Sequence, residues 1–454
     1  MPMSSPLHSR SRSNLLDPDR GGAPEAMNLL EDSPPATVEP LKLKPANSSS
    51  GYLRGWLPRS PIYFLIAWAI VCVKIAKDSI EKMDTTLRGS FFYEAFLYYN
   101  PLVMVAMMVW LWGVNLWAFL HYRVNYSKIF DLDQNHLTHK HIWKVASWMT
   151  IVISTSMTTY LYLYSNGEAN YAASQPAILY IGLPLVLILP FDVLYRSSRF
   201  FFLGTLLRLS LPLQPITFAD FFVADVLTSM SKVLSDIERS LCRMYHRQAA
   251  FEAEELCGSH SIWIPCILAL PYLFRFAQCL RQYTDTKERS CLFNALKYST
   301  AFPVVFLSAL KYHVLPEYWE GVYRPLWLLS SVVNSFYSFY WDISRDWDFS
   351  LFSGISRTKN VGLRAHLVYN PRWVYYWAIG SNLLLRCAWT YKLSAHLRHN
   401  YLTVFTFSGL EMLRRFQWIF FRVENEHNRL LLRTSSSPET EMGLLATDDE
   451  EHVV

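Results

Sequence analysis

Long apolar runs separated by short polar breaks dominate the chain from residue 58 to residue 422. A helix needs about 20 predominantly apolar residues to cross a bilayer. The pattern therefore predicts an all-α, polytopic membrane protein with about ten transmembrane helices. We expect these helices near 58–76, 98–120, 142–164, 175–195, 217–238, 262–281, 293–313, 323–343, 373–395 and 402–422. The run at 201–212 is too short to span and carries Arg208, which is typical of an interfacial helix or a bent connector.

Polar tails flank the apolar region and divide the chain into four expected parts. Residues 1–57 are rich in Ser, Pro and Arg without periodicity, which predicts a disordered cytosolic tail. Residues 58–212 would hold the first membrane helices and the connector, and 213–428 a core membrane domain containing an anion path. Residues 429–454 are acidic and predict a second disordered cytosolic tail.

The distribution of Lys and Arg in the loops predicts the orientation. The loop at 165–174 contains neither residue, whereas 196–210 and 344–372 are basic. The positive-inside rule then places both tails in the cytosol. The polar segment 239–261 would lie on the lumenal or external side, which is oxidising. Cys242 and Cys257 are therefore candidates for a short disulfide loop, with two unpaired thiols as the alternative.

Composition supports the membrane class and excludes several functions. Of the 454 residues, 52% are hydrophobic and only 17% are charged, against about 25% charged in soluble proteins. A net charge of +5 without a basic tract argues against nucleic-acid binding. The chain has no CxxC pair, P-loop, GxSxG or HExxH motif, so we expect no enzyme activity, cofactor or metal site. His136, His139 and His141 are interpreted as solvated loop residues.

Ionisable residues inside the apolar runs are the main chemical signal. An Arg at the centre of a membrane helix costs about 2.5–3.5 kcal/mol on insertion scales, and Arg414 and Arg415 are adjacent in one run. Such residues are expected to face the protein interior or a wet cavity. The set comprises five cations and four acids: Arg275, Lys297, Arg386, Arg414, Arg415, Asp225, Asp342, Asp346 and Glu411.

Helical spacing predicts how some of these groups cluster. Asp225, Thr228 and Lys232 would form one polar stripe on a single helix. Glu411 precedes the two arginines by three and four residues and can pair with either. Asp342 and Asp346 would share one helix face.

Two interpretations of the whole set remain open. The groups could be interhelical salt bridges, although many buried pairs are an inefficient source of stability. Alternatively they could line a path for a polar ion. Arginine predominance favours an anion, and planar guanidiniums suit oxyanions such as phosphate.

Several longer motifs carry a family resemblance. They are RFAQCLRQYTDTK (275–287), NALKYST (294–300), YWDISRDW (340–347), LLRCAWT (384–390) and LEMLRRFQWIFFRVENEH (410–427). These segments resemble the EXS domain, the membrane module of the xenotropic and polytropic retrovirus receptor phosphate exporter, plant phosphate-export proteins and yeast Golgi-retention proteins. The similarity extends over roughly 95–430.

The resemblance implies export of inorganic phosphate through a pore formed by the later helices, in contact with membrane lipid. Trp389 resembles the family's gate, Glu411 would support the arginine pair, and Cys242 and Cys257 resemble a lumenal cysteine pair. Thr228 stands where some members have an amide. The sequence does not decide the oligomeric state, and a homodimer is one possibility. The implied phosphate-contacting residues are Asp225, Thr228, Ser231, Arg275, Lys297, Tyr298, Asp342, Asp346, Arg386, Arg414 and Arg415.

The chain departs from the long family members before its first apolar run. Fewer than 60 residues precede that run, too few for the SPX domain of those exporters. Members without SPX resemble a yeast Golgi protein that returns phosphate from the lumen to the cytosol. We therefore expect a Golgi membrane, with the plasma membrane or another endomembrane as the alternative. A non-transporting adaptor that retains Golgi enzymes is the second functional hypothesis, and an enzyme acting on phosphorylated lipid is a third without a catalytic signature.

Overall fold

The computed structural model describes residues 59–132, 137–192, 194–246, 257–258, 260–349, 367–393 and 400–448. Within these ranges every regular element is helical and no strand occurs. Tyr63–Val454 form one compact unit, and the division of the membrane region at residue 212 stays a prediction. The tail predicted for residues 1–57 lies outside the described residues.

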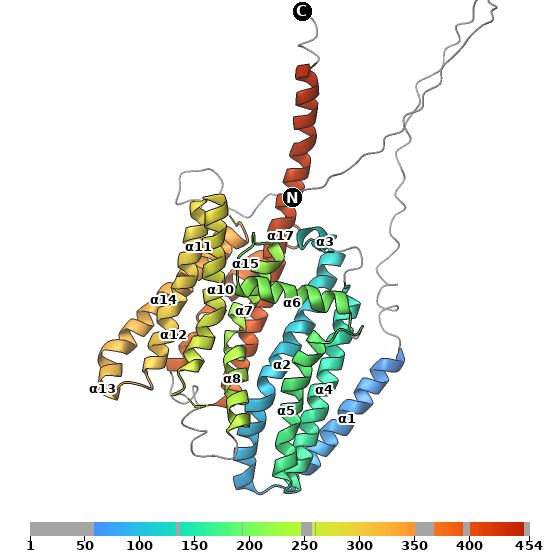
Figure 1. The fold of residues 1–454 in the computed structure, drawn as a ribbon, viewed down its shortest axis with the longest axis vertical. Coiled ribbons are helices and arrows are strands. Elements are labelled where there is room, and N and C mark those ends of the chain that lie inside the picture. Colours follow the sequence, from blue (N-terminus) through green and yellow to red (C-terminus); the bar gives the residue numbers. More distant parts are fainter. Residues whose placement is uncertain are drawn as a thin grey trace, which may run out of the picture. The chain divides into compact units, whose positions relative to one another are not determined.

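The first part of the chain forms long helices and two short ones. Their bounds are α1 (Arg59–Glu81), α2 (Thr85–His121), α3 (Tyr126–Ile129), α4 (His139–Ser165), α5 (Ala169–Ile188) and α6 (Arg196–Ser210). Helices α2, α4 and α5 pack side by side, while α6 lies across the ends of its neighbours (Figure 1). Helix α6 falls in the segment for which the sequence predicts an interfacial helix or a bent connector, and its place at a membrane surface stays a prediction.

The second part contains shorter helices and several π-helical or 3₁₀ turns. The elements are α7 (Phe218–Ser229), α8 (Ser231–Tyr245), α10 (Trp263–Thr286), α11 (Arg289–Ser299), α12 (Ala301–Leu310), α13 (Pro316–Tyr318), η1 (Trp319–Tyr323), α14 (Arg324–Trp341), η2 (Asp342–Asp346), α15 (Trp373–Arg386), η4 (Ala388–Leu393) and α17 (Tyr401–Asp448). Among the contacts between them, α17 packs against α2, α7 and α15.

Three expected spans are interrupted. The run 217–238 divides at Met230 into α7 and α8, 293–313 divides at Thr300, and 373–395 changes to a 3₁₀ turn after Cys387. Pro303 accounts for the second break, because its ring clashes with the carbonyl four residues earlier, that of Ser299. The expectation of one continuous helix was wrong at these places.

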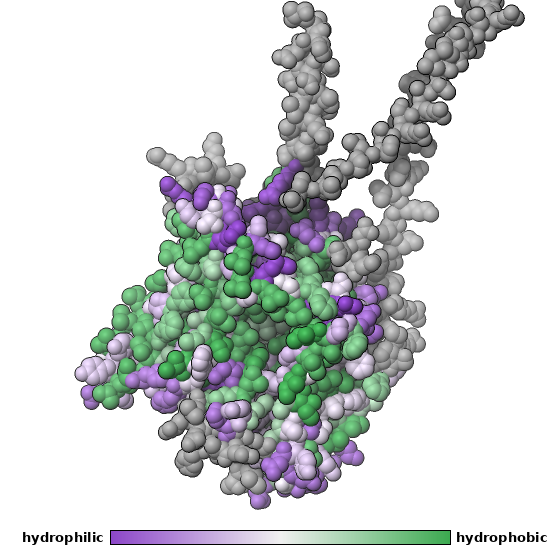
Figure 2. Space-filling model, viewed as in Figure 1, coloured by the Kyte–Doolittle hydropathy of each residue, from purple (hydrophilic) through white to green (hydrophobic). Residues whose placement is uncertain are grey.

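Among the residues that the structure describes, four helical segments are long and apolar enough to cross a membrane: Phe91–His121, Ala169–Ile188, Trp263–Thr286 and Arg289–Leu310. Apolar residues cover the middle of the helices on the face shown in Figure 2, and polar residues gather towards their two ends. The count of ten spans remains an expectation from the sequence.

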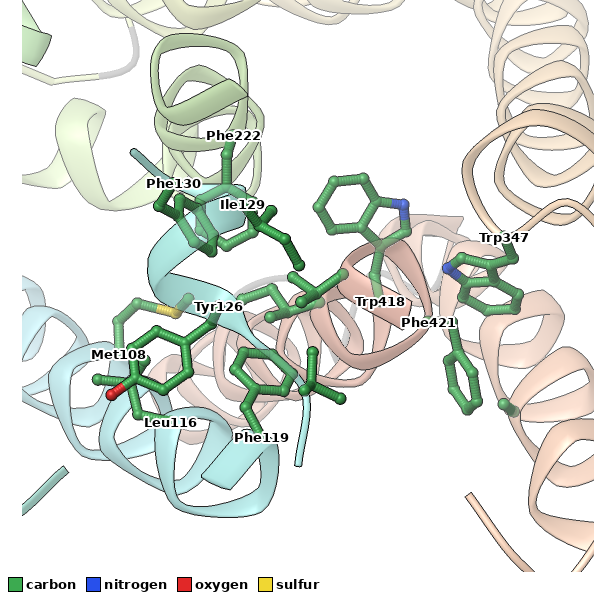
Figure 3. Packing of buried hydrophobic residues seen from close by; sticks show 14 of the residues in the cluster. Met108, Leu116, Phe119, Tyr126, Ile129, Phe130, Phe222, Trp347, Trp418 and Phe421 are labelled. Atoms are coloured by element: carbon green, nitrogen blue, oxygen red, sulfur yellow. The ribbon is translucent and has the colours of Figure 1, made fainter. Parts of the chain in front are cut away.

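A large hydrophobic cluster joins α2, α3, α7, α15 and α17. Phe119, Phe222, Trp347, Trp418 and Phe421 are among its buried aromatic residues (Figure 3). Such rings bury a large apolar area and favour edge-to-face contacts. The cluster fixes α17 against α2 and α7, and so positions the charged residues of α17.

The last helix is longer than expected. The sequence predicts a disordered tail from residue 429, whereas α17 continues to Asp448. Adding a residue to an existing helix is far less costly than nucleating a new one. The core-packed part of α17 thus supplies the nucleus for its polar extension.

Candidate functional site

Asp225 on α7 is the centre of the first charged cluster. Its Oδ1 accepts hydrogen bonds from Arg275 Nε at 2.9 Å and from Tyr298 Oη at 2.5 Å. Arg275 comes from α10 and Tyr298 from α11, and all three residues are buried. The first cluster is therefore an ion pair between α7 and α10, and the hydroxyl of Tyr298 donates a further hydrogen bond to its carboxylate.

Two further contacts hold Arg275 in place. Its Nη1 donates to Gln278 Oε1 at 2.7 Å, and its guanidinium lies 4.9 Å from the ring centroid of Tyr298. Gln278 in turn donates to the backbone carbonyl of Asp220 at 3.3 Å. Arg275 is thus connected to the beginning of α7 as well as to its middle.

Asp342 in η2 is the centre of the second cluster. Its Oδ2 accepts from Arg386 Nη2 at 2.5 Å and from Asn382 Nδ2 at 3.0 Å, both on α15. Arg414 Nη1 on α17 lies 3.7 Å from the same oxygen. One buried carboxylate therefore faces two arginines from different helices.

The adjacent arginines of α17 have different partners. Arg414 donates to both carboxylate oxygens of Glu411, at 2.6 and 2.8 Å. Arg415 instead donates to Ser229 Oγ at 2.8 Å and to Thr228 Oγ1 at 3.0 Å. The sequence left the partner of Glu411 open, and the structure assigns Arg414.

Lys297 on α11 lies between the two clusters. Asp225 of the first cluster and Asp342 and Asp346 of η2 all act electrostatically on its ammonium. The Nζ atom lies 4.3 Å from the ring centroid of Tyr298, and the residue is 7% exposed. Asp346 accepts a hydrogen bond from Trp418 Nε1 at 3.1 Å.

Two of the five cations lack a carboxylate at ion-pair distance in the described part of the chain. Arg275, Arg386 and Arg414 each have such a partner. Arg415 binds only hydroxyl groups and lies 4.5 Å from the ring centroid of Trp418, and Lys297 has aromatic neighbours. The site therefore combines close ion pairs with two buried cations on which carboxylates act only from beyond ion-pair distance: Asp225, Asp342 and Asp346 on Lys297, and Asp225 on Arg415.

The break at Met230 corrects one sequence prediction. Asp225 and Thr228 belong to α7, whereas Lys232 belongs to α8 and forms an ion pair with Asp236. The three residues therefore do not form one stripe on one helix. Ser231 begins α8 next to the break and is half-buried.

Trp389, the expected gate, lies in η4 directly after α15. Its Nε1 donates to Ser335 Oγ on α14 at 2.9 Å, and its ring meets that of Trp327 edge to face at 5.6 Å. The indole is thus held between η4 and α14, three residues after Arg386.

Sequence reasoning missed three residues of the site: Ser229, Gln278 and Asn382. Asn382 donates to Asp342 and its Oδ1 accepts from Arg414 Nη1 at 3.4 Å. Its position four residues before Arg386 on one helix face is a signal that could have identified it. Gln278 likewise follows Arg275 by three residues. Ser229 could not be found this way, because its role depends on the end of α7.

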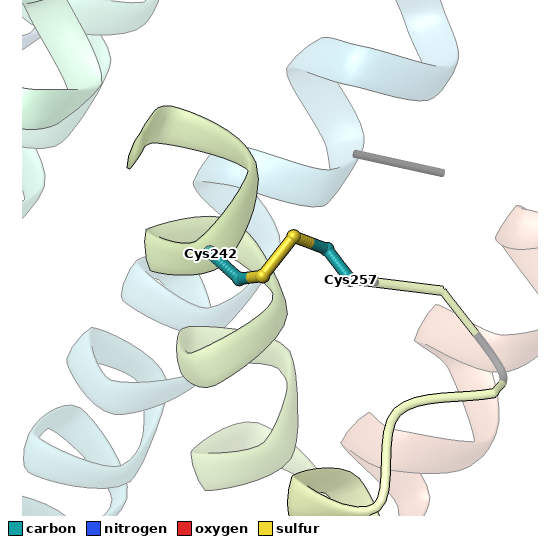
Figure 4. Close-up of a disulfide and its surroundings, with 2 residues drawn as sticks. All are labelled: Cys242 and Cys257. Atoms are coloured by element: carbon teal, nitrogen blue, oxygen red, sulfur yellow. A yellow bond between two sulfur atoms is a disulfide. The ribbon is translucent and has the colours of Figure 1, made fainter. Parts of the chain in front are cut away.

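Cys242 at the end of α8 and Cys257 form a disulfide with a Cα–Cα distance of 5.6 Å (Figure 4). This is the pairing for which the sequence left unpaired thiols as the alternative. The bond connects α8 to the segment that precedes α10.

The histidines of 136–141 have separate surroundings. His141 Nδ1 interacts with Thr138 at the N-terminus of α4, where it completes a capping box. His139 is buried at the start of the same helix, and His136 lies outside the described residues. In the described ranges no group of three His, Cys, Asp or Glu side chains could hold a metal ion.

Comparison with known proteins identifies the family. The family model described as the EXS family matches residues 95–428. The chain belongs to the EXS family. With its apolar helices, this EXS chain is an integral membrane protein.

Curated relatives of this EXS chain include proteins from an amoeba, a fish and a mouse. It is 33% identical over 347 residues to SPX and EXS domain-containing protein 3 of Dictyostelium discoideum, covering 74% of this chain and 37% of the relative. It is 35% identical over 339 residues to the xenotropic and polytropic retrovirus receptor 1 homolog of Danio rerio, covering 70% and 48%. Solute carrier family 53 member 1 of Mus musculus is 33% identical over 343 residues, again covering 70% and 48%. The matched region is thus half or less of these relatives' length.

Proposed function

We propose that this protein moves inorganic phosphate across a membrane along a path lined by the two charged clusters. One observation carries the proposal: Lys297 and Arg415 are buried positive charges without a carboxylate at ion-pair distance in the described part. Asp225, Asp342 and Asp346 offset these two charges only from beyond ion-pair distance, and five cations face four acids in the whole set, so one buried positive charge is in excess. A transported anion would be the missing partner.

The chemistry around Arg415 favours an oxyanion. Its present partners are two hydroxyls: Ser229 can donate its hydroxyl hydrogen to a phosphate oxygen, whereas Thr228 already donates to the backbone carbonyl of Asp225. A guanidinium presents fork-shaped donors that match two oxygens of phosphate. Lys297 would supply a compact charge to the same ion.

We propose that the path has two portions connected by Lys297. Arg275 would serve one portion with Asp225, Thr228, Ser231 and Tyr298. The other would be formed by Asp342, Asp346, Arg386, Arg414 and Arg415, with Glu411 beside Arg414. The acids hold the cations in position and weaken phosphate binding enough for release, as a channel-like path requires.

Transport also agrees with the names of relatives, since the matched mouse protein is named a solute carrier. We extend the proposal to ten transmembrane helices, to Trp389 as the gate, and to flux from the Golgi lumen to the cytosol. The proposal treats the protein as a transporter and not as an enzyme.

Uptake of radiolabelled phosphate into proteoliposomes tests the function. The purified chain should transport phosphate, and Lys297→Gln and Arg415→Gln should each abolish uptake while leaving reconstitution unchanged. Arg281→Gln is a matched control, because Arg281 pairs with Asp285 on the exposed part of α10. Wild-type uptake by both buried-site variants would refute the proposal.

A second candidate is a non-transporting adaptor that retains enzymes in the Golgi. The matched pairs Asp225–Arg275 and Asp342–Arg386 favour it, because interhelical ion pairs can be purely structural. Under this hypothesis exchanging Asp225 and Arg275 should preserve function. Under the transport hypothesis the exchange should reduce phosphate flux even in a folded protein.

A further inference from the structure

A cleft of about 320 Å³ opens away from the charged path, where α6, the 211–217 connector and the end of α3 meet. Small-molecule sites in proteins typically measure about 300–1,000 Å³. The lining includes Asp131, Arg208 and Gln214 and the rings of Phe130 and Phe201. None of these residues belongs to the proposed phosphate path.

The surroundings of the cleft indicate a membrane interface. Helix α6 has 15 residues, too few to cross a bilayer, and lies across the ends of α5 and α7 (Figure 1). Three leucines on α6 and just after it have largely exposed side chains: Leu207 at 72%, Leu211 at 67% and Leu213 at 75%. An apolar rim beside a charged cleft is the arrangement that an acyl chain and its headgroup would require.

The cleft offers both signs of charge. Arg208 donates through Nε to Asp220 at 2.9 Å and through Nη2 to Thr205 at 3.0 Å, which leaves Nη1 available for another acceptor. Asp131 is exposed, has a left-handed backbone with φ of 49°, and forms no ion pair with a described residue. With Asp220, which already pairs with Arg208, these groups sum to one negative charge, so a headgroup that brings a cation with its phosphate fits better than one with a further negative charge.

We propose that this cleft binds the headgroup of a zwitterionic phospholipid of the phosphatidylcholine type. Arg208 would bind the lipid phosphate. The quaternary ammonium would lie near Asp131 and against the exposed ring of Phe201, because aromatic faces attract such cations. A polyanionic headgroup fits less well, since it would meet the carboxylate of Asp131.

A chain of contacts connects the cleft to the phosphate path. Asp220 accepts from Arg208 and forms the capping box that starts α7. Its backbone carbonyl accepts from Gln278, which also holds Arg275. A lipid phosphate that draws Arg208 from Asp220 therefore alters the support of Arg275. Lipid occupancy is expected to change the phosphate flux, a consequence that rests on the proposed function.

Native mass spectrometry of the purified full chain tests binding directly. With equal phosphatidylcholine and phosphatidylserine, the wild type should retain phosphatidylcholine about two- to fivefold better, the factor that a surface charge–charge interaction supplies, because the additional carboxylate of phosphatidylserine would meet Asp131. Arg208→Gln should reduce lipid retention, and Asp131→Lys should reverse the preference. Arg196→Gln is the matched control, because Arg196 is exposed on α6 over the ring of Phe200 and does not line the cleft.

Asp131→Asn is the second variant, because asparagine tolerates the left-handed backbone at this position. The Asp131→Asn variant should lower the preference for phosphatidylcholine over phosphatidylserine without reversing it. An unchanged preference in both Asp131 variants, or a wild type that favours phosphatidylserine, would overturn the proposal. Free phosphocholine should not displace the lipid, and its displacement at millimolar concentration would instead assign the cleft to a soluble ligand.

Phosphate uptake into vesicles with and without phosphatidylcholine tests the coupling. The wild type should respond to phosphatidylcholine, and Asp131→Lys should not. Equal response by the two proteins would overturn the coupling. A wild type that transports no phosphate in either vesicle would refute the proposed function, while the lipid preference measured by mass spectrometry would stand.

Discussion

Arg415 Nε donates a 2.8 Å hydrogen bond to Oγ of Ser229, the residue at which α7 ends. The contact connects the middle of α17 to the break between α7 and α8. Because the helix stops there, Ser229 and Thr228 face the same guanidinium. A helix interruption thus gives a buried arginine two neutral partners instead of a carboxylate.

Ser229→Ala should lower phosphate uptake by roughly ten- to a hundredfold, because hydrogen bonds to charged groups contribute about 1.5–3 kcal/mol. The change removes a donor to the ion and a partner of Arg415 while keeping the net charge. Uptake by proteoliposomes at several phosphate concentrations measures the effect. Ser290→Ala on the exposed start of α11 is the control. Equal uptake by the two variants would show that Ser229 is not part of the path.

Asp225→Asn should destabilise the protein by about 3–5 kcal/mol, because it leaves Arg275 buried without its counterion. Thermal unfolding in detergent measures this effect. Combining it with Arg275→Gln should recover part of the loss, since the double variant contains neither buried charge. Additive destabilisation would mean that the two side chains act independently.

Glu411→Gln should tighten phosphate binding and slow release. The change frees Arg414 from its strongest partner and makes the site more positive by one charge. We expect a lower apparent KM together with a lower maximal uptake rate. Glu426→Gln, which disrupts the pair of Arg422 further along α17, is the control. A raised KM in Glu411→Gln would contradict a role for Glu411 in weakening the bound anion.

Cys242→Ser should lower the free energy of unfolding by about 3 kcal/mol, the chain-entropy value for a loop of about 15 residues. The two cysteines are separated by 15 positions. In the wild type, alkylation of the unfolded chain should modify Cys242 and Cys257 only after reduction. Modification of both without reductant would show that the bond does not form in the membrane-inserted protein.

The sequence alone determined the helical class and the identity of the charged residues in the apolar runs. Hydropathy and composition are properties of the linear sequence, so these features can be predicted without knowledge of how the helices pack. The sequence also predicted that Glu411 pairs with either Arg414 or Arg415, because residues three and four apart on a helix are neighbours. The structure shows the pair with Arg414.

Only the tertiary structure decided which charges are matched. Asp225 pairs with a residue 50 positions away and Asp342 with one 44 positions away, and helix spacing carries no information about such distances. The end of α7 at Ser229 was equally hidden, because no proline or glycine marks it. Burial against α2 and α7 sets the rotation of α17, and that rotation directs Arg414 to a carboxylate and Arg415 to two hydroxyls.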